Sequence, residues 1–527
     1  MDALRVDWGT PYALRATAQL WVGPSAIALA GHPPGHWQDF ASGNVIGHPG
    51  RQTVRVAATP TRVRFLRLLL LASSHTAPAG SRDVRDRLGF AIRELGVGVL
   101  RGGRLHDLIH HVASNRQTIT MASSTDPWHR ASDRDPGTEQ PGFDRVAASG
   151  LTNRLPLLTP VAVLYGTPPD AVAELTYLRA HHIPVRRVEL GEEPDGQLAT
   201  PEDYAALYEQ FSRALHTRFA HLQLGGPGFQ TSIPDWMAWP DAHGNRSWTS
   251  RFVGALRRAG KLAQLSFFSF EWYPFDNTCD PTGPQLAKAS RTLGSLLARQ
   301  TADGLPPSIP KLITEYGYSA FSGQAEVDRA GALLNADVVG RFFSDGGATA
   351  YLYGYEPAEL IREQSSCNTW GNLALFQSDS QAHIRHALAT YFGARLETRR
   401  WVKPGHGLHT LYPAAYQPLA GSSTTALSAY AVRRPDGRLA LMLLNLDPTH
   451  TVTVHVAVTS RAGGQGLGGS LDLSSLSGAQ YVWHPRDAAG YPAPDHPPAH
   501  TRVAGGQGLS LRLAPYSMSV LRTRGAR

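Results

Sequence analysis

Cysteine is scarce in this sequence, with two among 527 residues. Two cysteines cannot build a disulfide framework, so the small disulfide-stapled folds are excluded. Cys279 and Cys367 each follow a predicted strand end, where they could pair as one disulfide or remain free buried thiols.

Long hydrophobic runs are absent too. No stretch approaches the roughly 20 apolar residues of a membrane-spanning helix, and the longest run, FLRLLLLA at 65–72, is interrupted by Arg67. The first residues, MDALRVDWGTPYAL, lack the charged and apolar regions of a signal peptide. We expect no membrane association. Localisation stays open, because the protein could be secreted if its true N-terminus lies upstream of Met1.

Motifs of several function classes are missing. The net charge of +8 comes from scattered arginines, not from a basic block interleaved with aromatic residues, which disfavours nucleic-acid binding. The chain has no G-x-S-x-G elbow and no P-loop. His106 and His110 have the i, i+4 spacing of a helix, but HDLIH lacks the glutamate of a zinc-protease motif. We expect neither a metal nor an organic cofactor.

The chain does contain three zones of different patterning. Residues 1–100 are short strand-like runs between loops, which predicts a β-sandwich. In residues 101–395 strand-like runs alternate with helical patterns, which predicts an α/β domain with a parallel sheet. Residues 396–527 return to β patterning and predict a second β-sandwich, with LSLRLAPYSMSVLR at 509–522 as its last strand.

Seven strands are predicted in the central zone. A closed (β/α)8 TIM barrel needs eight, and the absent one would be the first. That strand could lie upstream of Met1, with the N-terminal sandwich inserted after it, or it could be ELGVGVL at 94–100. The seven candidates are QTITMA (117–122), LLTPVAVLY (157–165), VRRVEL (185–190), LQLGG (222–226), LSFFSF (265–270), PKLITEY (310–316) and ATAYLYGY (348–355).

Two of these strands end in glutamates. Glu193 follows VRRVEL in the segment GEEP, and Glu315 lies in LITEYG. The C-terminal strand ends of a parallel barrel meet at one mouth, so the two carboxylates can come together there. A pair about 5 Å apart serves retaining glycoside hydrolysis, as nucleophile and as acid/base. The alternatives are structural: Glu193 capping the next helix, and Glu315 pairing with an arginine.

The arrangement resembles glycoside hydrolase clan A, the retaining (β/α)8 glycosidases, and its layout is nearest to families 39 and 79. GEEP at 191–194 is similar to the clan's Asn-Glu-Pro after strand four, and ITEYG at 313–317 to its nucleophile segment. The resemblance implies that Glu193 is the acid/base, Glu315 the nucleophile, and Tyr273 in SFEWYPF the residue that orients the nucleophile. Further similar segments are LGGPGF (224–229) at strand five and LAPYSMSVL (513–521) at the last sandwich strand.

Two positions depart from the clan's pattern. Glu192 replaces the asparagine that hydrogen-bonds the sugar 2-hydroxyl. A glutamate could accept a hydrogen bond from that hydroxyl, and it would disfavour an anionic sugar. Glu271 stands where the clan often has histidine, and it could contact the sugar or hold the Tyr273 region in place. The other candidates for substrate contact are Asp126, Trp128, Tyr353 and Tyr355, with Trp236, Trp239 and Trp248 as stacking surfaces.

The N-terminal zone has a resemblance of its own. RVDWGTPYA and RVRFLRLLLLASS are similar to segments of discoidin-type jelly rolls, which often bind carbohydrate. A sandwich with a purely structural role is the alternative.

Together these features predict a retaining glycosidase that acts on an oligosaccharide, a polysaccharide or a simple glycoside. Transglycosylation on the same site is an alternative within enzymes. A carbohydrate-binding protein with a catalytically degenerate barrel is the alternative from another class. The sugar and the oligomeric state are not predicted.

Overall fold

The computed structural model describes residues 1–23, 36–77, 87, 90–108, 150, 152, 155–164, 168–196, 200–230, 241, 243–381, 383–402, 417–457, 459–460, 463–464, 467–506 and 508–524. The chain divides into two units, one formed by Met1–Gln140 with Leu164–Tyr177 and the other by Pro141–Val163 with Leu178–Arg527. Several predicted features lie outside the described residues: the strand QTITMA (117–122), His110, Asp126, Trp128, Trp236 and Trp239.

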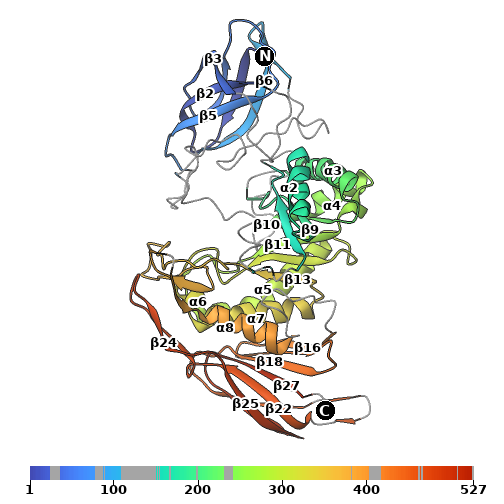
Figure 1. Cartoon of the computed structure of the whole chain (residues 1–527), viewed down its shortest axis with the longest axis vertical. Coiled ribbons are helices and arrows are strands. Elements are labelled where there is room, and N and C mark those ends of the chain that lie inside the picture. The colour runs from blue at the N-terminus through green and yellow to red at the C-terminus, as the bar shows by residue number, and fades with distance from the viewer. Residues whose placement is uncertain are drawn as a thin grey trace. The chain divides into compact units, whose positions relative to one another are not determined.

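Seven strands of the first unit form two antiparallel sheets, drawn in blue in Figure 1. Their orders are β4-β1-β6-β7 and β3-β2-β5. Alternate residues of β1 and β2, among them Leu4, Val6 and Ala16, share one core, so the two sheets face each other. The strands are β1 (Ala3–Trp8), β2 (Ala13–Val22), β3 (His36–Val45), β4 (Gly50–Arg55), β5 (Leu66–Ser73), β6 (Ile92–Arg101) and β7 (Arg104–Asp107).

The segment ELGVGVL is part of β6, which pairs antiparallel with β1. Leu95 and Val97 alternate toward the core of this unit, as a period of two requires. This segment therefore does not supply a barrel strand, and that alternative is wrong. His106 lies in strand β7, so its helical spacing to position 110 does not apply. The discoidin resemblance and the three-domain division stay predictions.

The second unit contains six parallel strands in the order β13-β12-β11-β10-β9-β8. Each corresponds to a predicted strand, because fully buried parallel strands show as continuous apolar runs in sequence. The strands are β8 (Leu157–Val161), β9 (Val185–Leu190), β10 (Gln223–Phe229), β11 (Phe267–Trp272), β12 (Lys311–Tyr316) and β13 (Thr349–Leu352).

The sheet curls into a half-barrel. Arg187 on β9 donates a hydrogen bond from Nη1 to Thr349 Oγ1 on β13, over 3.2 Å. In a flat sheet these strands would be roughly 19 Å apart, at about 4.8 Å per neighbour. Curling of this kind brings together the C-terminal ends of strands that are distant in the sheet order.

Helices follow most of these strands. In α3, Thr200 accepts a hydrogen bond from the Asp203 N–H and Pro201 is the first helical residue, as predicted. None of the helices among the described residues combines the length and apolarity needed to cross a bilayer. The helices are α2 (Pro168–Ala180), α3 (Pro201–Arg218), α4 (Trp248–Arg258), η4 (Leu262–Gln264), α5 (Thr282–Ala302), α6 (Gln324–Val327), α7 (Arg329–Ser344), α8 (Ala389–Leu396) and η5 (Glu397–Trp401).

The C-terminal part is antiparallel. A six-stranded sheet, β16-β17-β18-β27-β22-β25, shares a core with the pair β19-β26. On the other face of the large sheet, Tyr430 donates a hydrogen bond to Asp337 of α7 over 2.6 Å, and α7 and α8 lie between this sheet and the parallel strands (Figure 1). These strands are β16 (Gln417–Ser423), β17 (Leu427–Arg433), β18 (Leu439–Asn445), β19 (Val452–Val456), β22 (Leu467–Leu476), β25 (Ala499–Gly506), β26 (Leu509–Leu513) and β27 (Ser517–Thr523).

The predicted last strand needs a correction. The segment LSLRLAPYSMSVLR is two strands in two different sheets, β26 and β27. The chain changes sheet at Pro515, which lacks an N–H, and at Tyr516, whose φ is +41°. Three short pairs complete the described strands: β14 (Phe376–Ser378) with β15 (Ile384–Ala387), β20 (Thr459–Ser460) with β21 (Gly463–Gly464), and β23 (Tyr481–His484) with β24 (Tyr491–Asp495).

A buried acid in η5 makes stability depend on pH. Glu397 is 2% exposed, and its Oε1 has no hydrogen-bond partner among the described residues. Burial raises its pKa from 4.5 to about 8. Because the pKa of Glu397 is higher in the folded state than in the unfolded state, its contribution to the free energy of unfolding is fully present below pH 4.5. It is lost as the pH rises through 8, at about 1.4 kcal/mol per unit.

We therefore expect Glu397→Gln to raise the unfolding free energy at pH 9 by roughly 1 to 3 kcal/mol and to change it little at pH 5. Thermal unfolding at both pH values measures the difference. The exposed Glu356→Gln is the matched control, expected to have equal effects at the two values. A Glu397→Gln curve parallel to wild type across this range would contradict the prediction.

Candidate active site

Four glutamates lie at the C-terminal ends of β9, β11 and β12. Glu271 and Glu315 are opposite each other in the parallel register of β11 and β12, so their side chains share a face. One carboxylate oxygen from each of Glu192, Glu271 and Glu315 lies within 4.8 Å of the other two. The ends of β9 and β12 would be roughly 14 Å apart in a flat sheet, so the curl assembles this cluster.

The Glu-Glu-Pro turn is held against the end of β10. Glu193 has a φ of +47°, and its N–H donates to the Gly228 carbonyl over 2.8 Å. Gly228 has a φ of +64°, and a Cβ there would lie 3.1 Å from Glu189 Oε1. A left-handed non-glycine residue is a strained conformation that often marks a functional site. The strain here fixes where the Glu193 side chain begins.

The Glu193 carboxyl is hydrogen-bonded to Glu271 and to Gln230. Gln230 is itself held by its backbone N–H, which donates to Asp195 Oδ1 over 3.1 Å. Burial raises the pKa of Glu193, and the negative charges of Glu192 and Asp195 raise it further, although the two hydrogen bonds oppose this. Glu193 does not cap the next helix, because Thr200 does so.

Glu315 accepts a hydrogen bond at Oε2 from the hydroxyl of Tyr273, over 3.0 Å. Tyr273 directly follows β11 and is 9% exposed, so its ring is fixed by packing. Burial raises the pKa of Glu315 to about 7, with a further contribution from the Glu192 charge, while the Tyr273 bond lowers it. Within the described residues Glu315 makes no ion pair with an arginine, so the alternative role of Glu315 as a structural ion-pair partner is not supported.

Glu189 is a buried acid that the sequence analysis missed. It lies in β9, is 7% exposed, and its Oε1 has no hydrogen-bond partner among the described residues. Burial raises its pKa to about 7, and the Glu192 charge adds to this. The sequence feature that could have revealed it is an acidic residue inside the strand VRRVEL, because buried parallel strands are otherwise apolar.

The predicted aromatic residues separate into two groups. Tyr353, which is 44% exposed, lies edge-on to Tyr273 with ring centroids 6.2 Å apart, beside the carboxylates. Tyr355 instead packs against Phe376, at 6.3 Å. Trp248 is 1% exposed, so its prediction as a sugar-stacking surface is wrong. Its indole fills a helix-sheet core with Tyr204, Phe229 and Phe252.

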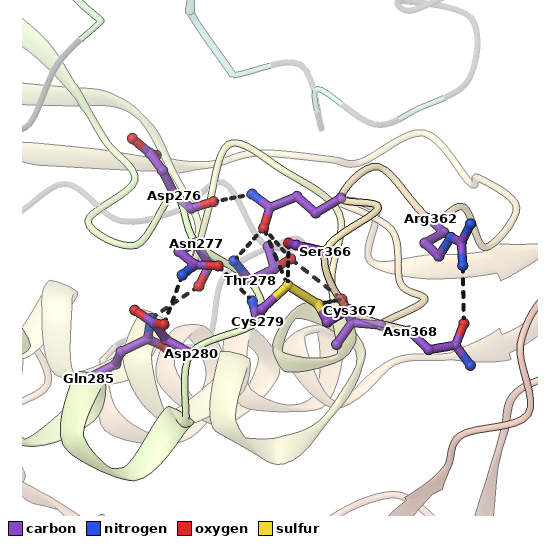
Figure 2. The surroundings of a disulfide bond; sticks show 12 residues. Asp276, Asn277, Thr278, Cys279, Asp280, Gln285, Arg362, Ser366, Cys367 and Asn368 are labelled. Atoms are coloured by element: carbon purple, nitrogen blue, oxygen red, sulfur yellow. Dashed lines mark hydrogen bonds between the residues drawn. A yellow bond between two sulfur atoms is a disulfide. The ribbon is translucent and has the colours of Figure 1, made fainter. Parts of the chain in front are cut away.

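A disulfide ties together two loops near the site, shown in Figure 2. Cys279, six residues after Tyr273, is bonded to Cys367 of the segment after β13, with a Cα–Cα distance of 5.7 Å. Gln364 reinforces the link, because its Oε1 accepts from the Thr278 N–H over 3.2 Å. Of the two alternatives for these cysteines, the structure shows the pair. Such a bond is typical of proteins from oxidising compartments.

The three clustered carboxylates also offer oxygen ligands of the kind that hard cations prefer. A metal ligand must be deprotonated, however. Burial raises the pKa of Glu271 to about 11, and the neighbouring charge of Glu315 adds to this, so its carboxyl is protonated at neutral pH. Without a bound cation, the cluster therefore carries a proton on Glu271, which suits it to proton transfer.

No protein-family model matches the chain, and no curated protein matches it in sequence. Several solved structures resemble it. A family 44 endoglucanase from Clostridium acetobutylium is 11% identical, over 67% of this chain and 70% of that one, with a TM-score of 0.47. The family 51 arabinofuranosidase from Xanthomonas axonopodis is 14% identical, over 70% and 76%, with a TM-score of 0.47.

A third similar structure is a 4-O-α-L-rhamnosyl-β-D-glucuronidase from Fusarium oxysporum, 14% identical over 77% of this chain and 82% of that one, with a TM-score of 0.46. Likeness at this level carries no weight for function, which has to be argued from the residues of the site. Membership of clan A and the layout of families 39 and 79 remain resemblances of the sequence motifs.

Proposed function

We propose that this chain is a retaining glycoside hydrolase with a (β/α)8 barrel, of which the described parallel strands are six. The observation that carries the proposal is the carboxylate cluster at the strand ends. It places oxygens of Glu315 within 4.8 Å of neighbouring carboxylates and joins Glu193 to the same cluster through Glu271. Double displacement requires two carboxylates about 5 Å apart. We assign Glu193, which is joined to the cluster through Glu271, as the partner of Glu315.

In the first step Glu315 attacks the anomeric carbon as its carboxylate. The bond from that carbon to the leaving oxygen breaks, its electron pair goes to the oxygen, and Glu193 supplies the proton. In the second step Glu193 removes a proton from water, whose oxygen displaces Glu315. Tyr273 holds Glu315 by its 3.0 Å hydrogen bond. The raised pKa of Glu193, caused first by burial, keeps a proton available for the first step.

The substrate is proposed to be an uncharged sugar within an oligosaccharide, a polysaccharide or a simple glycoside. Glu192 is exposed, and its carboxylate oxygen lies within 4.8 Å of those of Glu271 and Glu315, so a uronic acid would add a further negative charge there. Tyr353 supplies an exposed ring beside the carboxylates for stacking. Asp126, Trp128 and Tyr355 stay candidates for substrate contact.

Two alternatives share this geometry. A transglycosylase would use the same glutamates, with a sugar hydroxyl in place of water. A carbohydrate-binding protein with an inactive barrel would keep the sugar site without turnover. Tyr273 bonded to Glu315, and the raised pKa of Glu193, both favour an enzyme, because binding alone requires neither.

A panel of aryl glycosides of neutral sugars tests the proposal. We expect one of them to be cleaved, and proton NMR of the first-formed sugar to show the anomeric configuration of the substrate. The rate should be unchanged by EDTA, because no step uses a metal. Inversion of configuration would exclude double displacement. Binding of a sugar without cleavage of any glycoside would favour the carbohydrate-binding alternative.

A further inference from the structure

Glu271 has no task in the two steps described above. It is the penultimate residue of β11, is 3% exposed, and lies opposite Glu315 in the parallel register. Its carboxyl is hydrogen-bonded to Glu193, and one of its oxygens is within 4.8 Å of a Glu315 oxygen. It therefore contacts the proposed acid/base directly and lies next to the proposed nucleophile.

The charges around Glu271 are negative. Burial raises its pKa to about 11, and the charges of Glu315, Glu193 and Glu192 add to this. Ionisation would place a further negative charge at a buried position beside Glu192 and Glu315, which costs more than keeping the proton. A protonated carboxyl has one O–H to donate. The titratable groups that face it are Glu192 and Glu193 after β9, Glu315 on β12, Tyr273 after β11 and Tyr353 after β13.

Glu315 and Glu193 differ in what they need from a neighbour. The nucleophile already accepts a hydrogen bond from the Tyr273 hydroxyl, over 3.0 Å. Glu193 alternates between acid and carboxylate, and the carboxylate form requires a donor. Gln230 is one partner of its carboxyl and Glu271 is the other. The Glu271 O–H is the donor that lies on the side of the nucleophile.

We propose that Glu271 is a positioning residue that stays protonated throughout the cycle and donates a hydrogen bond to the carboxylate that Glu193 becomes. This inference rests on the proposed function, because it assigns a task within the same site. When Glu193 gives its proton to the leaving oxygen, the Glu271 O–H stabilises the resulting charge. When Glu193 takes a proton from water, the same bond weakens. Glu271 neither gains nor loses a proton in either step.

Removing this donor makes Glu193 a weaker acid. Its carboxylate would remain close to the charges of Glu192 and Asp195, which raise its pKa, without the bond that lowers it. The effect is largest for substrates whose leaving group needs protonation, and small for a good leaving group such as dinitrophenolate. The nucleophile keeps its Tyr273 bond and is unaffected, because a neutral carboxyl is removed rather than a charge.

The test compares Glu271→Gln with Glu271→Ala. The amide of glutamine can still donate, so Glu271→Gln should keep kcat/KM within about three-fold of wild type. Glu271→Ala should lose on the order of 10- to 100-fold with poor leaving groups, and less than about five-fold with dinitrophenolate. The basic limb of its pH profile should move to higher pH, and the acidic limb, which reports Glu315, should stay in place.

Two kinetic results would overturn the inference. Equal losses in Glu271→Gln and Glu271→Ala would show that the carboxyl acts as an ionised group or as a sugar contact. A loss in Glu271→Ala that is independent of the leaving group, with an unmoved basic limb, would show a merely structural role.

Infrared spectroscopy gives a measurement that is independent of turnover. The spectrum of wild type minus that of Glu271→Gln at pH 9 should contain the carbonyl band of a protonated carboxyl, because burial raises the pKa of Glu271 to about 11. Absence of that band would overturn the inference even in an active glycosidase. If the band is present and wild type cleaves no glycoside, the proposed function fails, and the catalytic task of Glu271 fails with it.

Discussion

Glu315→Ala is expected to lower kcat/KM by roughly 10⁴- to 10⁶-fold, about 5 to 8 kcal/mol of transition-state stabilisation. The reason is that Glu315, whose carboxylate accepts a 3.0 Å hydrogen bond from Tyr273, is the residue proposed to form the glycosyl-enzyme. Azide should restore turnover, because a small anion can occupy the space left by the carboxylate. The product should be a glycosyl azide of inverted configuration, since a single displacement then occurs.

The matched control is Tyr273→Phe, which keeps the ring and removes only the hydroxyl that donates to Glu315. Its loss should be smaller, on the order of 10- to 100-fold, and azide should not rescue it, because the nucleophile is still present. Full activity in Glu315→Ala would show that the nucleophile lies elsewhere. A loss without azide rescue would call for a check of folding by circular dichroism before the role is rejected.

The parallel sheet was predictable because its strands are apolar runs bounded by turn signals. All six described strands of that sheet match predicted segments, and the cap at Thr200 follows from side-chain chemistry within one turn. The C-terminal zone was harder. The segment 509–523 continues its strand-like pattern through Pro515, yet the two halves belong to different sheets. The local sequence pattern does not show that the chain passes from one sheet to another.

The features of the site also divide into those that the sequence predicts and those that it does not. That Glu193 and Glu315 stand at strand ends could be predicted from the order of residues alone. The bond between Glu193 and Glu271 could not, because it depends on the curl of the sheet and on the register shift between Phe270 and Glu271. Glu189 was missed because a single acidic residue does not change the interpretation of an otherwise apolar run as a buried strand. Trp248 was misplaced because burial against α3 is set by tertiary packing, not by residue type.

The two neighbouring glutamates at the end of β9 are both candidates for the acid/base. Glu192, rather than Glu193, has a carboxylate oxygen within 4.8 Å of those of both Glu271 and Glu315. Proximity to the nucleophile alone would therefore favour Glu192 as acid/base. The hydrogen bonds to Glu271 and Gln230, and the pKa raised by burial, favour Glu193. The dependence of the rate on the leaving group distinguishes Glu192 from Glu193, because only replacement of the acid/base changes that dependence.

Glu193→Ala is expected to lose about 10² to 10⁴-fold in kcat/KM for alkyl glycosides, and far less for dinitrophenyl glycosides. With the dinitrophenyl substrate the first step needs no acid, so the glycosyl-enzyme should accumulate, giving a burst of phenolate and a lowered KM. Azide attacks this intermediate without a base. The resulting glycosyl azide should have retained configuration, the opposite of the product expected from Glu315→Ala.

Glu192→Ala is the matched control at the adjacent position. We expect it to change KM and the preference among sugars, through the proposed contact of Glu192 with the substrate, while the ratio of rates for the two leaving groups stays at the wild-type value. If Glu192→Ala instead shows the burst and the retained azide product, and Glu193→Ala does not, the two roles are exchanged. The Glu271 hydrogen bond would then serve to hold Glu193 as a structural group, while the retaining mechanism itself would stand.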